Sequence, residues 1–496
     1  MSARNRKRRA AVQTPSPSPL PAKLDALRHG RAVYVAASLA VLIPCFWQSR
    51  VQAGDLSSHL YNAWLADLIR QGQAPGLVLV RQSTNILFDW ILSALFRFAG
   101  ADAAQRVSVA IAVLAFVWGA FAFVSAVSGS RAWHLLPVIG ILAYGWVFHM
   151  GFFNFYLSMG LSLGALAICW KGNPRQCVPA VPLLAVAWLA HALPVVWALG
   201  LLAYLWTARR MPDRFRAFLL PVALLAMALL SVAVRARFTT LWLRTQVVSA
   251  TGLDQVWVYD GKYLAVSLAL LCVWGLLFAG LIRESGWKNL VLGIPFQFCM
   301  LTAFAVLVFP TSVLIPGYKH TLAYIADRMS LPLTVCFCAV VASAPRRVNL
   351  RYFAGAAAVV FFAFLFHDER ALNAFEDRMD RRVESIQPWQ RVISAVGASG
   401  LRVNALAHMI DRVCVGRCYS YANYEPSTAQ FRVRAGGESP LIVSTYGDSL
   451  ALQMGTYRVQ QRDLPLYQIN LDAKGRMITL SLKAGAPCTI TDWNPW

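Results

Sequence analysis

Negatively charged residues are scarce in this sequence. Aspartate and glutamate together number 23 of 496 residues, against 46 lysines and arginines, and charged residues of both signs make up only 14% of the chain. Soluble domains carry about 25% charged residues, so this scarcity excludes an ordinary soluble globular protein. The apolar fraction of 58%, with 17 tryptophans and 27 phenylalanines, instead predicts a membrane protein.

The formal net charge of +23 does not predict a nucleic-acid partner. The lysines and arginines lie mostly in short segments beside apolar runs, where positive charge holds the topology of a membrane protein. We therefore expect membrane lipid, and no nucleic acid, as a partner of this chain.

The cysteines form neither a CxxC motif nor the Cys/His spacing of a zinc site. Seven of the ten lie in or beside apolar runs, where cysteine behaves as a small buried hydrophobe. The other three, Cys414, Cys418 and Cys488, lie near the C-terminus. In an oxidising compartment Cys414 can pair with Cys418, or one of them can pair with Cys488; free thiols are the alternative.

Apolar runs along the chain predict an all-α polytopic membrane bundle of about 11 transmembrane helices. Residues 1–31 are basic and rich in proline and serine, which predicts a disordered cytoplasmic arm, and residues 32–366 form the transmembrane domain. The expected spans are Ala32–Trp47, Val107–Val127, Leu135–Phe148, Phe153–Trp170, two within Val178–Thr207, Ala217–Val234, Tyr263–Ile282, Leu290–Phe309, Ser330–Ala344 and Tyr352–Phe366.

The run over Val178–Thr207 allows either one long tilted helix or two short ones. Basic residues stand at both ends, with Lys171 before the run and Arg209 after it. Two short spans broken at His191–Pro194 place both ends on the inner side, so we choose two.

Residues 50–106 are predicted to be the first outer loop. Apolar residues recur at helical spacing over Leu56–Arg70, which predicts a helix that lies along the membrane surface and begins after Asp55. Asp55 and His59 are four residues apart and therefore share one face of that helix.

A second juxtamembrane helix is expected over Asn85–Gly100. This segment is apolar but short, and it contains Asp89, a residue that is costly to expose to lipid. Asp89 is therefore expected to face protein or water.

The composition changes at residue 367, and residues 367–496 are predicted to form a small α+β domain on the periplasmic side. Residues 367–396 are charged and helical in pattern, and short β-rich runs follow. The expected strands are Phe431–Arg434, Leu441–Ser444, Thr456–Gln460, Pro465–Asn470 and Met477–Leu482.

The stretch Gly54–Leu65, GDLSSHLYNAWL, resembles the first outer loop of the GT-C superfamily of integral-membrane glycosyltransferases. That superfamily includes protein mannosyltransferases and aminoarabinose transferases, and the chain is especially similar to uncharacterised bacterial membrane proteins of this class. The loop of that superfamily often carries two acidic residues. Here only Asp55 is present, with Ser57 where a second acid would stand, and this departure leaves the need for a divalent metal open.

The resemblance implies inverting transfer of a sugar from a polyprenyl-phosphate donor to a glycan, lipid or protein acceptor. The reaction would take place at the periplasmic face of the bacterial inner membrane, with Asp55 as the catalytic base. A leaving lipid phosphate requires positive charge and hydrogen-bond donors. The candidate substrate-binding residues are His59, Arg81, Asp89, Lys319, His320 and Arg328. No residue is assigned as a metal ligand.

Other interpretations remain open at this point. Asp55 also fits the N-cap of a helix, and Arg328 also fits an anchor at the lipid headgroups. The alternative function is a transporter or flippase for a lipid-linked anion, in which basic outer loops bind phosphate without chemistry. Transporters usually contain related halves, and no internal repeat is evident in this sequence.

Overall fold

The computed structural model describes residues 19–319, 321–342 and 350–493. The chain divides into two compact units, Met1–Ile43 and Pro44–Trp496. The first unit contains helix α1 (Pro19–Leu42), so residues 19–31 are helical where we expected a disordered arm. The alanines and leucines that follow the prolines of this segment favour a helix, and the prolines are tolerated in its first turn.

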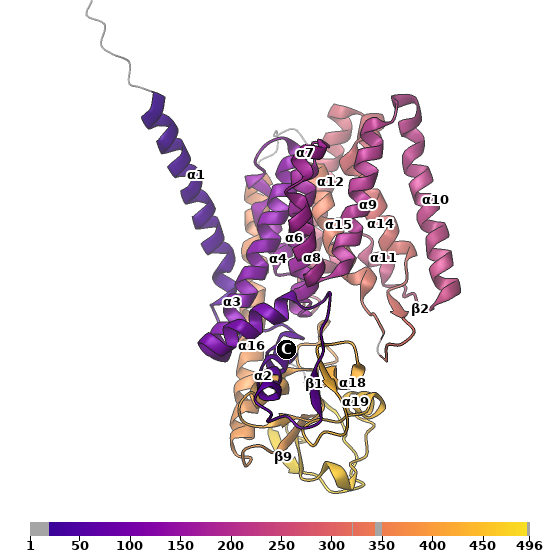
Figure 1. The fold of residues 1–496 in the computed structure, drawn as a ribbon. Helices are drawn as coiled ribbons and strands as arrows, with labels where there is room; N and C mark the ends of the chain where they lie inside the picture. Colours follow the sequence, from indigo (N-terminus) through magenta and orange to yellow (C-terminus); the bar gives the residue numbers. More distant parts are fainter. Residues whose placement is uncertain (1–18, 320, 343–349, 494–496) are drawn as a thin grey trace, which may run out of the picture. The chain divides into compact units, whose positions relative to one another are not determined.

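The second unit is mostly helical up to residue 384 (Figure 1). Its helices are α2 (Leu56–Arg70), α3 (Leu87–Ser128), α4 (Leu136–Ala143), α5 (Trp146–His149), α6 (Phe153–Cys169), α7 (Pro174–Cys177), α8 (Ala180–Ala190), α9 (Ala192–Arg210), α10 (Asp213–Arg237), α11 (Gln246–Ser249), α12 (Tyr263–Ser285), α13 (Trp287–Leu292), α14 (Ile294–Val308), α15 (Ile325–Ala342) and α16 (Leu350–Glu384).

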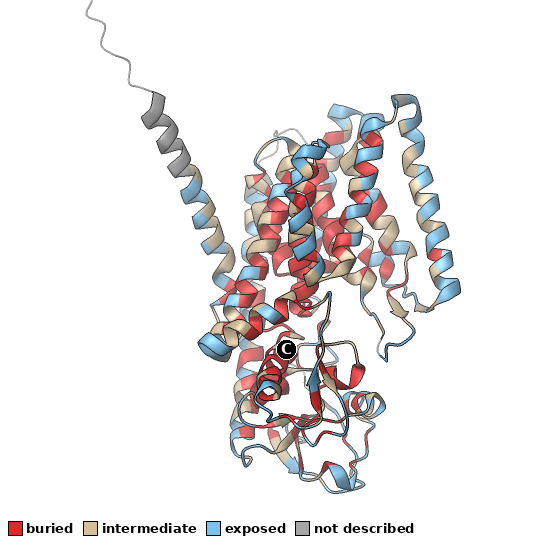
Figure 2. Cartoon of the chain, in the orientation of Figure 1, coloured by how far each residue is buried: buried red, intermediate tan, exposed pale blue. Residues whose placement is uncertain are grey.

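Six helices among the described residues are long and apolar enough to cross a membrane, namely α3, α9, α10, α12, α15 and α16. Shorter apolar helices of 10–17 residues occupy the remaining expected spans. These helices indicate a multi-pass membrane protein, but the expected count of about 11 spans is not confirmed. Of these six helices, α10 is the least buried, because only 6% of its most apolar 18-residue stretch is covered by protein. Figure 2 shows α10 exposed along most of its length.

Several expected helices are interrupted. The expected span Leu135–Phe148 consists of α4 and α5, which are separated at Tyr144 and Gly145. A Cβ atom at Gly145 would lie 2.5 Å from the carbonyl oxygen of Gln255, so the chain bends there around another segment. The predicted break at His191 is confirmed, because this residue is extended between α8 and α9.

The first outer loop contains both expected helices, but their surroundings differ from the prediction. Helix α3 is kinked at Gly100, which has φ +77° and ψ 178°, so its first part is the expected second juxtamembrane helix. Helix α2 has the expected bounds, yet most of its residues are buried, including Ser58 and Asn62. Its polar residues bond to other segments, so α2 lies inside the protein and not along a membrane surface.

Helix α16 runs without interruption through the expected domain boundary at residues 366 and 367. The region after it contains helices α17 (Met409–Cys414), α18 (Glu425–Thr428) and α19 (Tyr446–Gln453). Its strands are β4 (Arg391–Ser394), β5 (Val396–Gly397), β6 (Tyr419–Ser420), β7 (Val433–Ala435), β8 (Leu466–Leu471), β9 (Met477–Ser481) and β10 (Thr491–Asp492).

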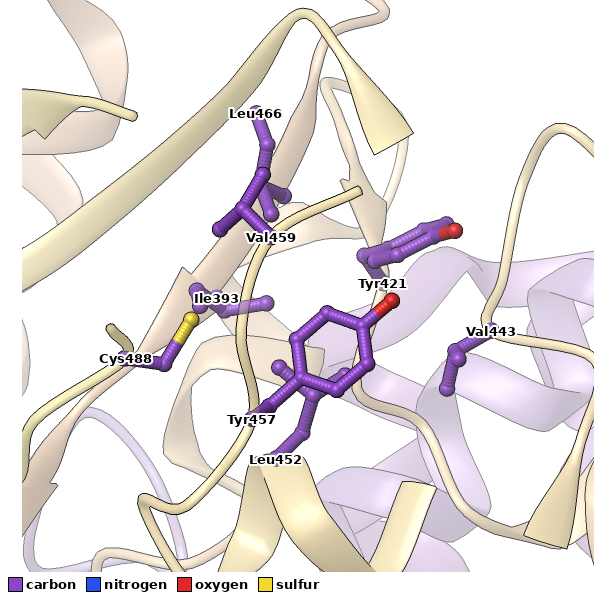
Figure 3. Packing of buried hydrophobic residues seen from close by; sticks show 8 residues of the cluster. All are labelled: Ile393, Tyr421, Val443, Leu452, Tyr457, Val459, Leu466 and Cys488. Carbon is purple, nitrogen blue, oxygen red and sulfur yellow. The ribbon is translucent and has the colours of Figure 1, made fainter. Parts of the chain in front are cut away.

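A four-stranded sheet in the order β6-β4-β8-β9 organises this C-terminal region. Strand β4 pairs in parallel with β6 and with β8, and β8 pairs antiparallel with β9. The expected strands at β8 and β9 are confirmed. The runs Leu441–Ser444 and Thr456–Gln460 are not strands, because their side chains pack into the core from irregular segments: Val443, Tyr457 and Val459 belong to the cluster in Figure 3.

One short strand pairing joins this region to the first outer loop, and one disulfide closes it internally. Strand β1 (Leu77–Leu79) of the first outer loop pairs antiparallel with β7. A disulfide joins Cys414 to Cys418, and Cys488 is a buried free thiol. Strands β2 (Thr239–Leu241) and β3 (Ser312–Leu314) pair separately, between two loops of the bundle.

Candidate functional site

Asp55 lies where the first outer loop, the bundle and the C-terminal region meet. The backbone N–H of Gly54 donates to the carbonyl oxygen of His149 at 2.8 Å, and that of Asp55 donates to Met150 at 3.1 Å. On the other side, a Cβ atom at Gly54 would lie 3.1 Å from the carbonyl oxygen of Asn404. The backbone at Asp55 is therefore held from two sides.

Gly151 permits the close approach of the bundle to Asp55. Its φ of +85° lies in the left-handed region, and a Cβ atom there would lie 2.4 Å from the backbone nitrogen of Asp55. Glycine avoids both the conformational strain and the collision. Any side chain at position 151 would therefore displace Asp55.

The side chain of Asp55 does not cap α2. The residue occupies the N-cap position, but no side-chain capping hydrogen bond is formed. Its carboxylate, which is 24% exposed, instead lines a cavity of about 370 Å³. Capping therefore does not explain this side chain, and a carboxylate on a cavity of this size is accessible to a ligand.

His408 is the nearest charged partner of Asp55 and also lines the cavity. Its Nε2 lies 3.7 Å from Oδ1 of Asp55, while its Nδ1 lies 3.1 Å from Oδ2 of the buried Asp411. Burial alone lowers the pKa of His408, but the hydrogen bond and charge of Asp411, with the charge of Asp55, raise that pKa above its ordinary value. Ser420 donates its hydroxyl to the other oxygen of Asp411 and orients it.

Arg328 faces the same cavity from the first turn of α15. Its guanidinium group lies over the ring of Phe152, with Cζ 3.8 Å from the ring centroid. In the part of the chain that the structure describes, this group has no ion pair, and its Nε is buried without a hydrogen-bond partner. The neighbouring Asp327 is already occupied, since it accepts a hydrogen bond from Thr311 at 2.8 Å. Arg328 therefore presents unused donors toward the cavity.

His59 and Asp89 form a pair beside the cavity. Nδ1 of His59 lies 2.8 Å from Oδ1 of Asp89, and Asn154 donates to the other carboxylate oxygen at 2.7 Å. Burial lowers the pKa of His59, but the charge and hydrogen bond of Asp89 outweigh it and raise the pKa to about 9. His59 is therefore cationic at neutral pH. His59 lines the cavity, whereas Asp89 holds His59 from behind.

Two other predicted substrate-binding residues are not brought to this cavity. Arg81 and Lys319 are both exposed, and neither lines it. His320 lies outside the described residues. The rest of the lining combines amide and aliphatic side chains with aromatic ones, which include Phe153, Phe155, Tyr324, Tyr424 and Phe431. The structure therefore gathers Asp55, His59 and Arg328, and their chemical roles stay predictions.

A buried ion-pair network fixes the C-terminal region against the loop that carries Asp55. The guanidinium group of Arg412, in α17, donates to both carboxylate oxygens of Glu376, in α16, at 2.7 and 2.6 Å. It also donates to the carbonyl oxygen of Val51 at 2.8 Å, and Gln52 donates to Glu376 at 2.8 Å. This network holds the start of α17, where His408 stands, next to residues 51–55.

Sequence reasoning missed His408 and Asp411. These two residues are three positions apart, a spacing that places two side chains on one face of a helix. That spacing was the only local signal that they belong together. Nothing in the sequence connects position 408 with position 55, because the contact depends on how the C-terminal region packs on the first outer loop.

Among the described residues, no group of three or more His, Cys, Asp or Glu side chains is arranged to hold a metal ion. Comparison of the whole chain with protein-family models, with curated proteins and with solved structures finds no match.

Proposed function

We propose that this protein is an inverting glycosyltransferase that moves a sugar from a polyprenyl-phosphate donor to an acceptor hydroxyl. The observation that carries the proposal is that the carboxylate of Asp55 lines one cavity of about 370 Å³ with the guanidinium group of Arg328, which has no ion pair among the described residues. A base and an anion-binding cation on one cavity are the two groups that this reaction requires.

The reaction assigns one role to each group. The acceptor oxygen attacks the anomeric carbon of the donor while its proton passes to the Asp55 carboxylate. The bond between the anomeric carbon and the phosphate oxygen breaks, and the lipid phosphate leaves with the electron pair. Arg328 binds that phosphate through its guanidinium fork, and the cationic His59 adds positive charge on the same cavity.

The expected location is the periplasmic face of a bacterial inner membrane. The basic N-terminal arm favours an inner N-terminus, which would place residues 50–106 on the outer side. The disulfide between Cys414 and Cys418 supports an oxidising compartment for the C-terminal region. A polyprenyl chain in the bilayer would then reach the cavity from the apolar helices around it.

The experiment is a screen of radiolabelled polyprenyl-phosphate sugars with the purified full-length protein in lipid nanodiscs. Removing the base with Asp55→Asn should lower sugar release from the donor by about 100-fold or more. The control is Asp67→Asn on the segment that follows Asp55, because Asp67 does not line the cavity and its carboxylate accepts a hydrogen bond from Gln71 at the surface.

Two outcomes contradict the proposal. An Asp55→Asn variant that turns over donor as fast as the wild type would remove Asp55 as the base. A wild-type protein that consumes none of the donors, but moves them between leaflets of a liposome, would support the flippase alternative.

A further inference from the structure

A second cavity, of about 340 Å³, lies in the C-terminal region next to the Asp55 cavity. The two cavities have three lining residues in common: Asn404, His408 and Gln453. His408 therefore borders both spaces, with Asp55 3.7 Å away on one side and Asp411 3.1 Å away on the other. A ligand in the second cavity would approach Asp55 past this histidine.

The chemical character of the second cavity differs from that of the first. Among the described residues that line it, none is a lysine or an arginine. Its polar lining includes Ser394, Asn404, Asp411 and Gln453. His408 also lines this cavity, but it already lies between the carboxylates of Asp55 and Asp411, which would repel a phosphate. An uncharged molecule with several hydroxyl groups can donate to these oxygen atoms and accept from the amides.

From these observations we infer that the second cavity is the acceptor site, and that it takes an uncharged, hydroxyl-rich molecule of the sugar class. This inference rests on the proposed function, to which it adds the acceptor and a role for the C-terminal region. The donor phosphate lies at Arg328, the acceptor hydroxyl reaches Asp55 beside His408, and the two substrates meet at the shared border of the cavities. A volume of this order suits a small saccharide unit.

The first test fills the second cavity and leaves the donor site intact. Ala407 is exposed and lines only the second cavity, so Ala407→Trp can block it without disturbing a core. The matched control is Ala473→Trp, at an exposed alanine of the same region that lines neither cavity. Two rates are measured on one active donor: hydrolysis by water, and transfer to a panel of methyl hexopyranosides.

Ala407→Trp should lower transfer to the glycosides by at least about tenfold, because the acceptor loses its position, while hydrolysis is unchanged. Ala473→Trp should change neither rate. Equal transfer by Ala407→Trp and wild type, or a parallel loss of hydrolysis and transfer, would overturn the acceptor assignment. A wild type that hydrolyses donor but glycosylates no member of the panel would overturn the assigned chemical class.

The second test measures binding without turnover, so that it stands even if the proposed reaction fails. The variant Ala407→Cys places a thiol in the second cavity, and mass spectrometry of its peptide measures the rate at which that thiol is alkylated. Methyl hexopyranosides should slow this alkylation, whereas inorganic phosphate should leave its rate unchanged. Protection by phosphate, or by neither compound, would contradict the inference. Protection by glycosides in a protein that consumes no donor would contradict the proposed function alone.

Discussion

The two sides of the Asp55 cavity are built differently. One side is formed by the bundle and the first outer loop, and is called the bundle side below. It carries two cationic groups: Arg328, which has no ion pair among the described residues, and His59, which is held by Asp89. The C-terminal side carries His408, whose other nitrogen is fixed by a buried carboxylate. The comparison separates two tasks: cations of the bundle can bind an anion that arrives from the membrane, while the C-terminal side acts on the carboxylate of Asp55.

The two sides are also fixed differently. Arg328 lies on α15, a helix long enough to cross a membrane, and Asp89 lies on the first part of α3, before the kink at Gly100, so the positions of both follow from helix packing. The C-terminal side depends on contacts between distant segments, among them the buried ion pair between Arg412 and Glu376. Each side can therefore be disturbed without the other, and the four predictions that follow test this separation.

The largest effect is expected from Arg412→Ala, which detaches the C-terminal side. The change leaves Glu376 buried without its cation, and breaking a buried pair in this way costs about 3–5 kcal/mol of stability. The apparent melting temperature of the protein in detergent measures this loss. Limited proteolysis should cut the C-terminal region first and spare the bundle.

Arg417→Ala is the matched control for that change. Arg417 also pairs with a residue of α16, Asp380 at 2.7 Å, but its side chain is 45% exposed. Surface ion pairs contribute at most about 1 kcal/mol. If both variants unfold at the same temperature, the Arg412 network does not hold the C-terminal side in place.

The next effect is a pH dependence that belongs to the bundle side. The pKa of His59 is raised to about 9 in the folded protein, so its pairing with Asp89 stabilises the fold fully below the unfolded value of 6.5. That stabilisation, on the order of 3 kcal/mol, is lost as the pH rises through about 9. The melting temperature of His59→Gln should therefore lie furthest below that of the wild type near pH 6, and should approach it above pH 9.

Asp89→Asn separates this pair from other titrating groups. Without the carboxylate the pKa of His59 is no longer raised by its main partner, and the alkaline loss of stability should largely disappear. A variant whose stability falls with pH as the wild type does would show that another group titrates.

Third, Arg328→Ala should remove phosphate binding on the bundle side and leave the fold intact, since Arg328 has no ion pair among the described residues. Loss of one donor to a developing negative charge costs about 100-fold in kcat. Arg328→Lys keeps the charge but loses the bidentate fork, so it should recover part of the rate. Donor turnover measures both variants, and an Arg328→Ala enzyme with wild-type kcat would remove Arg328 from the reaction.

Much of the bundle side followed from the sequence. The bounds of α2 were predicted correctly because they depend on local signals, the apolar spacing over Leu56–Arg70 and the glycine at the end, Gly72. The break at His191 followed from basic residues at both ends of one apolar run. Asp55 and Arg328 were proposed as site residues from the family resemblance of the chain, and the structure puts both on one cavity.

The C-terminal side did not follow, because its contacts join distant segments. The apolar spacing of α2 predicts a helix with one apolar face, but not that Asn62 on another face meets Asn423 at 3.0 Å. Residues such as Val443 and Val459 have strand-like composition and yet pack into the core from loops. His408 lies more than three hundred positions from Asp55, and no local pattern encodes that contact.

The smallest effect, and the most specific, is expected from His408→Gln on the C-terminal side. Glutamine keeps a hydrogen-bonding side chain but cannot carry the positive charge that faces Asp55 at 3.7 Å. We expect a loss of about tenfold in kcat, typical of a residue that positions a reactive group. Because the pKa of His408 is raised by Asp411, wild-type activity should fall at alkaline pH as the imidazolium deprotonates, and the variant should lack that alkaline limb. Asp411→Asn should move the limb to lower pH without abolishing it. If both variants keep the wild-type pH profile, His408 supports the fold alone, and the C-terminal side has no part in controlling Asp55.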